Sequence, residues 1–222
     1  MTVVWFSSAC GGSGTTTVAA LCALTSATSD ATVLVDLTGG AAILVGLGAH
    51  GVTVPADHVV TVTSGLTFID ATVTPATAPD VLVDTLAATG ATVIVDAGRN
   101  NQPSATTGGV VRHYRVLHPN DVAVWHAFEV DLVRDAALHD VCRVDGLVVV
   151  GEARRGVVDR RDIATVLGAP VVATIGYRAR LARVVDRDGL LTYRPPARLR
   201  RTLHTILDHA LAPVVAPIGG GS

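Results

Sequence analysis

The sequence predicts a single α/β domain built on a doubly wound, mostly parallel sheet. Short β-rich runs alternate with Ala-rich helical stretches along 222 residues, a length typical of one domain. The β-rich runs are continuously apolar, which indicates that both faces of the sheet are covered. Hydrophobic residues make up 49% of the chain but aromatic residues only 4%, so Val, Ala, Leu and Ile must fill most of the core.

Expected strands alternate with expected helices, which indicates parallel strands joined by right-handed crossovers. The first helix is apolar nearly all round, which predicts a buried helix. A turn at Ser64-Gly65 separates two short strands. The expected strands are Val3–Ser7, Thr32–Asp36, Val59–Val62, Leu66–Ile69, Thr92–Asp96, Val130–Val133, Leu147–Val150 and Val171–Ile175. The expected helices are Thr16–Ala27, Asp80–Ala88, Ala136–Val141, Arg160–Leu167, Ala179–Asp186 and Ala197–Leu211.

Two segments fall outside this alternation. Asn100–Ala127 is polar and rich in His and Pro, and we expect a long loop there, with room for a short helix. The chain ends in Gly-Gly-Gly-Ser, a composition typical of a flexible tail. We therefore expect the domain to span residues 1–212 and the tail residues 213–222.

The run ACGGSGTTT at residues 9–17, directly after the first apolar run, carries the clearest chemistry. Its glycines let successive backbone N–H groups turn toward phosphate oxygens, and the following helix adds the positive end of its dipole. Thr16 or Thr17 can offer a hydroxyl to Mg²⁺, as the Ser/Thr of a P-loop does. The predicted nucleotide-binding residues are Gly11, Gly12, Ser13, Gly14, Thr15, Thr16 and Thr17. The alternative is a glycine turn that holds no ligand.

Two further expected strands end in aspartate. Asp36 closes the run VLVD and Asp96 closes TVIVD, and parallel strands present such ends at one edge of the sheet. Asp96 has the character of a Walker B carboxylate, which holds Mg²⁺ directly or through water. We predict a Mg²⁺ site formed by Thr16, Asp36 and Asp96, with contact through water. The alternative for each aspartate is a helix cap or a loop anchor.

Together these motifs resemble the MinD/ParA family of deviant Walker A ATPases, in the SIMIBI class of P-loop NTPases. Within the family the chain is most similar to the CpaE/TadZ branch, pilus-positioning proteins whose loop lysine is often Ala, Ser or Thr. The resemblance implies a P-loop NTPase fold with ATP and Mg²⁺ as cofactors. It also implies a homodimer or higher assembly and a protein partner in a localisation, pilus or partition system.

Three positions depart from the family pattern K-G-G-x-G-K-[ST]-[ST] and V-D-x-D. Cys10 occupies the place of the signature lysine that reaches across the dimer, and Thr15 that of the lysine that bridges the β- and γ-phosphates. Thr38 replaces the second aspartate, which helps to position the attacking water. All 17 basic residues are arginine, so no other lysine can substitute. Because phosphoryl transfer depends on neutralising charge at the γ-phosphate, we predict weak ATP binding with little or no hydrolysis.

Two alternatives to this pseudo-ATPase stay open, and no catalytic residue is assigned. The first is a slow Mg²⁺-dependent ATPase in which Arg99 or Arg154-Arg155 restores the missing charge. The second is an interaction or polymerising module that has lost nucleotide altogether. For the favoured pseudo-ATPase the predicted role is the positioning or scaffolding of a cellular assembly. Pilus machinery, septum placement, plasmid or phage DNA and secretion apparatus are all compatible with the sequence, and the resemblance alone favours the first.

Composition and the last helix indicate where the protein acts and whether it contacts DNA or a membrane. Three cysteines without CxxC spacing and the lack of a signal peptide predict a cytoplasmic protein. A net charge of −2 does not favour general nucleic-acid binding, so DNA contact is not favoured. Membrane contact is not favoured either, because the apolar face of the last helix is expected to pack on the sheet. That face comprises Leu199, Leu203, Ile206, Leu207 and Leu211.

Overall fold

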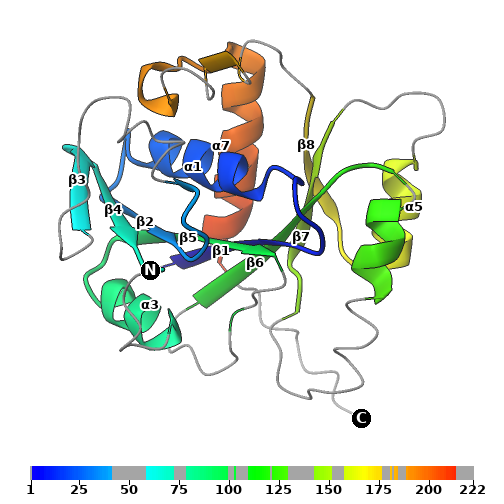
Figure 1. Ribbon diagram of the computed structural model, residues 1–222, viewed down its shortest axis with the longest axis horizontal. Helices are drawn as coiled ribbons and strands as arrows, with labels where there is room; N and C mark the ends of the chain where they lie inside the picture. Colours follow the sequence, from blue (N-terminus) through cyan, green and yellow to red (C-terminus); the bar gives the residue numbers. More distant parts are fainter. Residues whose placement is uncertain are drawn as a thin grey trace.

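The computed structural model has a single α/β domain with an eight-stranded sheet, which confirms the predicted fold class (Figure 1). It describes residues 2–41, 59–72, 79–99, 103, 110–120, 122–129, 143–151, 158–176, 181, 183–184 and 189–213. The strands are β1 (Thr2–Ser8), β2 (Thr32–Asp36), β3 (Val59–Thr63), β4 (Leu66–Asp70), β5 (Thr92–Arg99), β6 (Val110–Leu117), β7 (Gly146–Val150) and β8 (Val171–Ile175). The helices are α1 (Thr15–Ser26), α3 (Pro79–Ala87), α5 (Arg160–Leu167) and α7 (Ala197–Leu211), with a 3₁₀ turn η1 at Leu190–Thr192.

The strands lie in the order β3-β4-β2-β5-β1-β6-β7-β8. Each neighbouring pair is parallel except β3 and β4, which form an antiparallel hairpin around the turn that was expected at Ser64-Gly65. The registers align Asp36 with Asp96 and Phe6 with Asp96 across β2, β5 and β1. The two predicted aspartates therefore lie on adjacent strands at the carboxyl edge of the sheet.

Apolar side chains on the two faces of the sheet form separate cores. On one face Val4 and Phe6 of β1 pack with α1 and α7. On the other face Val3 and Trp5 pack with Val83 of α3. Because β1 is buried on both faces, its residues Val3–Phe6 are all apolar, as the sequence indicated. Figure 1 shows α1 and α7 on one side of the sheet and α3 on the other.

Helix α7 packs against β8 and α1, and its leucine face is buried there. The expectation for that face is confirmed at Leu199, Leu203, Ile206 and Leu207. It is wrong for Leu211, which is 44% exposed, because the smaller Ala210 occupies the buried position at the end of the helix. The apolar face of α7 is thus covered by the fold. No helix in the described part of the chain is long and apolar enough to cross a membrane.

Strand β6 lies inside the segment that was expected to be a long loop, so that expectation is wrong for residues 110–117. Polar residues in the strand hid it: Arg112 forms an ion pair with Asp145, and His113 bonds to Ser7 in the interior. The expected short helix occurs at residues 122–129. The expected strand Val130–Val133 and helix Ala136–Val141 lie outside the described residues. Of Ala179–Asp186, residues 181, 183 and 184 are described, and they are helical.

Candidate functional site

The glycine loop connects β1 to α1 above the carboxyl edge of the sheet. Gly12 and Gly14 have φ angles of 77° and 86°, in the left-handed region that favours glycine. Helix α1 begins at Thr15, and no side chain caps its first turn. The first helical bond runs from the N–H of Val18 to the carbonyl of Gly14. The N–H groups of Thr15, Thr16 and Thr17 therefore have no partner within the helix, which suits an anionic ligand.

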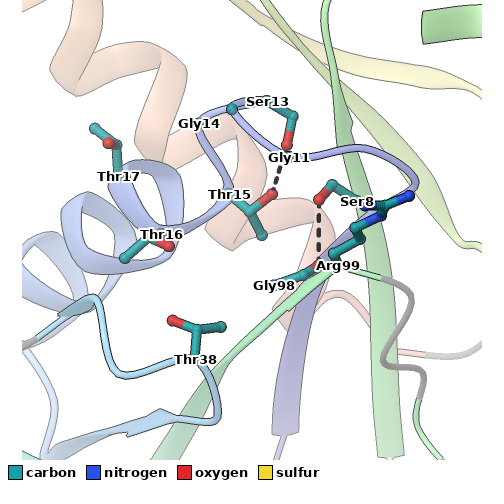
Figure 2. Close-up of a pocket in the computed structure, with 11 residues that line it drawn as sticks. Ser8, Gly11, Ser13, Gly14, Thr15, Thr16, Thr17, Thr38, Gly98 and Arg99 are labelled. Atoms are coloured by element: carbon teal, nitrogen blue, oxygen red, sulfur yellow. Dashed lines mark hydrogen bonds between the residues drawn. The ribbon is translucent and has the colours of Figure 1, made fainter.

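A pocket of about 450 Å³ opens in front of this loop (Figure 2). All seven residues predicted to bind nucleotide line it. The sequence did not single out Ser8 and Gly98 for this pocket, although both lie within two residues of a predicted motif. The lining residues are Ser8, Gly11, Gly12, Ser13, Gly14, Thr15, Thr16, Thr17, Thr38, Gly98 and Arg99.

Thr15 occupies the position of the loop lysine, and its side chain is turned into the loop. Its hydroxyl lies 2.8 Å from the hydroxyl of Ser13, and both residues are buried (Figure 2). This bond joins two residues of the loop itself and leaves the pocket open beside them. The loop thus has the backbone shape of a P-loop and lacks the ammonium group of a loop lysine.

Asp36 at the end of β2 is fully buried and accepts several hydrogen bonds from the loop that follows. Its Oδ1 accepts from the N–H groups of Thr38 and Gly39 at 2.8 and 3.1 Å, and its Oδ2 accepts from the N–H of Ala41 at 2.8 Å. Both carboxylate oxygens therefore serve as loop anchors. That Asp36 takes part in a Mg²⁺ site stays a prediction. A Mg²⁺ ion at Asp36 would have to share the carboxylate oxygens with these hydrogen bonds.

Asp96 lies beside Asp36 and is also fully buried. Burial raises its pKa to about 6; hydrogen bonding from Thr16 lowers the pKa and the charge of Asp36 raises it. The N–H of Gly98 donates to its Oδ1 at 3.2 Å. The contact with Thr16 links Asp96 to the first turn of α1, where the predicted hydroxyl ligand of Mg²⁺ lies.

Thr38 connects the two aspartates to the pocket. Its hydroxyl lies 2.8 Å from Oδ1 of Asp36 and 3.3 Å from Oδ2 of Asp96, so one hydroxyl serves both acids. Gly98, with a φ angle of 58°, follows Asp96 closely, and a Cβ atom there would lie 2.4 Å from Cγ2 of Thr38. Glycine is therefore required at position 98 by its backbone and by the close approach of Thr38.

Arg99 is the last residue of β5 and the cation that lines the described part of the pocket. The expected strand ended at Asp96, but β5 continues to Arg99 and pairs it with Ser8 after a register shift. Figure 2 shows Arg99 beside Ser8, across the pocket from Thr16 and Thr17. Cys10 is a free, partly exposed thiol in the same loop, outside the pocket lining. Arg154 and Arg155 lie outside the described residues.

The donor set fits Mg²⁺ that is bound together with a phosphate ligand. Mg²⁺ usually takes one or two carboxylates, a hydroxyl, phosphate oxygens and water rather than an all-protein cage. Thr16 and Asp96 match that pattern, because Thr16 lines the pocket, its side chain lowers the pKa of Asp96, and Asp96 lies next to Thr38 of the same lining. Among the described residues no group of three or more His, Cys, Asp or Glu side chains could hold a metal alone.

His118 was not predicted, and it contacts the glycine loop. Its Nε2 lies 2.9 Å from the carbonyl oxygen of Gly12, and its Nδ1 lies 2.6 Å from that of Val150. The sequence offered one signal, a His-Pro pair directly after an apolar run. That signal was lost because β6 itself was not recognised.

The fold and the pocket together define a P-loop NTPase fold of the MinD/ParA type. Neither a protein-family model nor a curated protein sequence matches the chain significantly. Solved structures do match in fold. The MinD cell division protein of Aquifex aeolicus is 17% identical, with a TM-score of 0.71 over 93% of this chain and 97% of that one.

Two further structures show the same likeness. A ParA family ATPase from Chlorobium tepidum is 17% identical, with a TM-score of 0.66 over 90% of this chain and 96% of that one. The septum site-determining protein MinD from Pyrococcus horikoshii, solved with Mg-ADP, is 14% identical, with a TM-score of 0.67 over 94% and 95%. These likenesses establish the fold that the sequence motifs indicated.

Proposed function

We propose that this protein is a degenerate MinD/ParA-type nucleotide-binding protein that holds ATP weakly with Mg²⁺ and hydrolyses it poorly or not at all. One observation carries the proposal: the glycine loop is shaped around an open pocket while the lysine position, Thr15, is bonded inside the loop. Backbone N–H groups and the helix dipole can still attract phosphate. Positioning and charge neutralisation for hydrolysis are much reduced.

Thr16 and Asp96 are the residues that we propose hold Mg²⁺, with Asp36 supporting them through Thr38. When bound, the ion would neutralise charge on the phosphates. The chain's own residues then do the rest. Gly11–Thr17 wrap the phosphates with N–H donors, and Arg99 faces them from β5. The fold shared with a MinD structure that contains Mg-ADP supports this assignment.

In the cell, we propose that the protein acts in positioning or scaffolding, as a homodimer or higher assembly with a protein partner of a localisation, pilus or partition system. The CpaE/TadZ branch and the deviant Walker A description belong to this proposal, because they depend on motif resemblance. The proposal also includes a cytoplasmic location, which the free thiols of Cys10 and Cys22 support. It further includes a domain that spans residues 1–212 and a tail at residues 213–222.

A calorimetric titration with Mg·ATP tests the proposal. We expect weak binding by the native chain and binding at least about tenfold weaker for Gly12→Ala, whose side chain would strain the loop. Gly168→Ala is the matched control, because Gly168 also has a positive φ angle and open space but lies at the end of α5. No heat at millimolar Mg·ATP, and no nucleotide released on denaturing the purified protein, would favour the nucleotide-free module instead.

The slow ATPase is the second candidate, and the place of Arg99 in the pocket lining favours it. Phosphate release that Asp96→Ala abolishes would support it, because contaminating enzymes would not respond to that change.

Size-exclusion chromatography with and without Mg·ATP tests the proposed assembly. A nucleotide-dependent shift to a dimer is the expected result.

A further inference from the structure

His118 ties three segments together at the carboxyl edge of the sheet. It follows β6, and its ring nitrogens contact the carbonyl oxygens of Gly12 in the glycine loop and Val150 at the end of β7, at 2.9 and 2.6 Å. Strands β1, β6 and β7 are neighbours in the sheet. The ring therefore lies between the loop that follows β1 and the last residue of β7.

The chemistry of these contacts favours one form of the ring over the others. A carbonyl oxygen only accepts hydrogen bonds, and a neutral imidazole has a single N–H. In the neutral ring, one nitrogen lone pair would face a carbonyl oxygen at hydrogen-bond distance, which is repulsive. The imidazolium form alone donates to both oxygens. The geometry thus fits a positively charged His118.

The contact with Gly12 also fixes a neighbouring backbone group. Because the peptide bond is planar and trans, the N–H of Ser13 points opposite to the carbonyl of Gly12. Holding that carbonyl at His118 therefore sets the direction of the Ser13 N–H. On the other side, the side chain of Val150 lies under Gly14, where a Cβ atom would be 3.5 Å from its Cγ1. The loop is held at Gly12 by His118 and supported at Gly14 by Val150.

We propose that protonated His118 is a positioning residue that clamps the phosphate-binding loop and gives it the positive charge that Cys10 and Thr15 do not supply. The affinity part of this inference rests on the proposed function, but the clamp itself does not. Polyphosphate then binds more tightly to the form with imidazolium at position 118. A charge-assisted hydrogen bond predicts a difference of about tenfold in affinity.

Few other charged groups bear on this ring. The neighbours recorded for it in the described part of the chain are the carbonyls of Gly12 and Val150 and the small residues Pro119 and Gly151. The ion pairs recorded there, Arg112–Asp145 and His126–Glu129, do not include it. Among the described residues that line the pocket, Arg99 carries a charge, and Asp96 lies next to Thr38 of the lining. Asp96 affects binding over a similar pH range, so only a comparison of variants isolates His118.

The first test uses the protein without nucleotide. ¹⁵N NMR of the imidazole nitrogens is recorded from pH 5.5 to 8.5, with exchange rates of the loop amides at residues 11–17. We expect His118 to carry two protons at low pH, and the loop amides to exchange faster once it loses one. A ring with a single proton across the whole range, or exchange that does not follow its titration, overturns the clamp.

The second test measures Mg·ATP affinity by calorimetry over the same pH range for the native chain, His118→Gln and the control His126→Gln. His126 lies on the helix at residues 122–129 and pairs with Glu129. We expect native and His126→Gln affinities to exceed that of His118→Gln by about tenfold at pH 5.5 and to converge with it by pH 8.5. Equal pH dependence in all three overturns the charge assignment. Absence of ATP binding at every pH defeats the proposed function, and the NMR result alone then decides the clamp.

Discussion

The hydroxyl of Thr38 stands 3.3 Å from Oδ2 of Asp96 and 2.8 Å from Oδ1 of Asp36, where the resembled family has a second carboxylate. A third acid at this place would add negative charge beside two buried carboxylates. Threonine instead offers one proton to the pair. Threonine at this position therefore adds no further charge beside the two buried aspartates.

Thr38→Val removes that hydroxyl while keeping the shape of the side chain. We expect the free energy of unfolding at pH 7 to fall by about 1–3 kcal/mol, because two buried carboxylates lose a donor. Urea denaturation measures the change. Thr72→Val is the matched control: Thr72 is exposed, as Thr38 is, and bonds to Asp70 at the end of β4 in the same pattern, but Asp70 is only partly buried, whereas Asp36 and Asp96 are fully buried. Equal losses for both variants would contradict the role of burial.

Asp96→Asn tests the cost of a buried charge. Burial raises the pKa of Asp96 from 3.8 to about 6, so the folded chain binds its proton more tightly than the unfolded chain does. Stability therefore falls as pH rises from about 4 to 6 and stays low above that range. The variant should be more stable than the native chain by up to about 3 kcal/mol at pH 7.5, and similar to it at pH 4.

Thermal unfolding across pH 4–8 measures this difference, with the exposed Asp208→Asn on α7 as the control. A native chain whose stability does not fall between pH 4 and 6 would contradict the raised pKa. The same variant should bind Mg·ATP less well, since Asn replaces a charged oxygen near Thr16. Gain of stability with loss of binding is the combination expected of an acid kept for a ligand rather than for the fold.

The sequence was sufficient for the parts of the fold that depend on apolar runs and glycine patterns. β1, the glycine loop, α1 and the strand-end acids Asp36 and Asp96 follow from local composition and spacing. β6 could not be found in this way, because Arg112 and His113 interrupt its pattern. Their partners Asp145 and Ser7 lie 33 and 106 residues away along the chain. Pairing over such separations satisfies buried polar groups, and no local signal records it.

The candidate site, like the fold, could be predicted only in part from the sequence. The loop residues could be named from the motif, but the use of their side chains could not. The bond of Thr15 to Ser13, the bonds of Asp36 to its own loop, and the contact of His118 with Gly12 all depend on the folded backbone. Arg99 was one of several arginine candidates by topology, and its place became specific only through the extension of β5 beyond Asp96.

Arg99→Gln tests the pocket cation. Because Arg99 is exposed, we expect Mg·ATP binding to weaken only about two- to fivefold at low salt. The difference should disappear near 0.5 M salt, where exposed charges are screened. Calorimetry at two salt concentrations measures both effects, with the exposed Arg160→Gln on α5 as the control. Unchanged binding with a loss of phosphate release would instead assign Arg99 to the slow ATPase.

Thr15→Lys restores the ammonium group at the loop position where the resembled family has one. The change breaks the bond to Ser13, and the longer side chain must leave the loop for the pocket, where a polyphosphate would stabilise it. We expect Mg·ATP binding to tighten by about 10–100-fold, the range of one charge-assisted hydrogen bond to phosphate. Thr17→Lys adds the same charge two residues along α1, and its affinity for Mg·ATP should rise less, because position matters as well as charge.

Hydrolysis should stay slow in both variants, since Thr38 cannot orient water as a carboxylate does. Calorimetry and a phosphate-release assay separate the two effects, and fast turnover by Thr15→Lys would show that the lysine alone had been limiting.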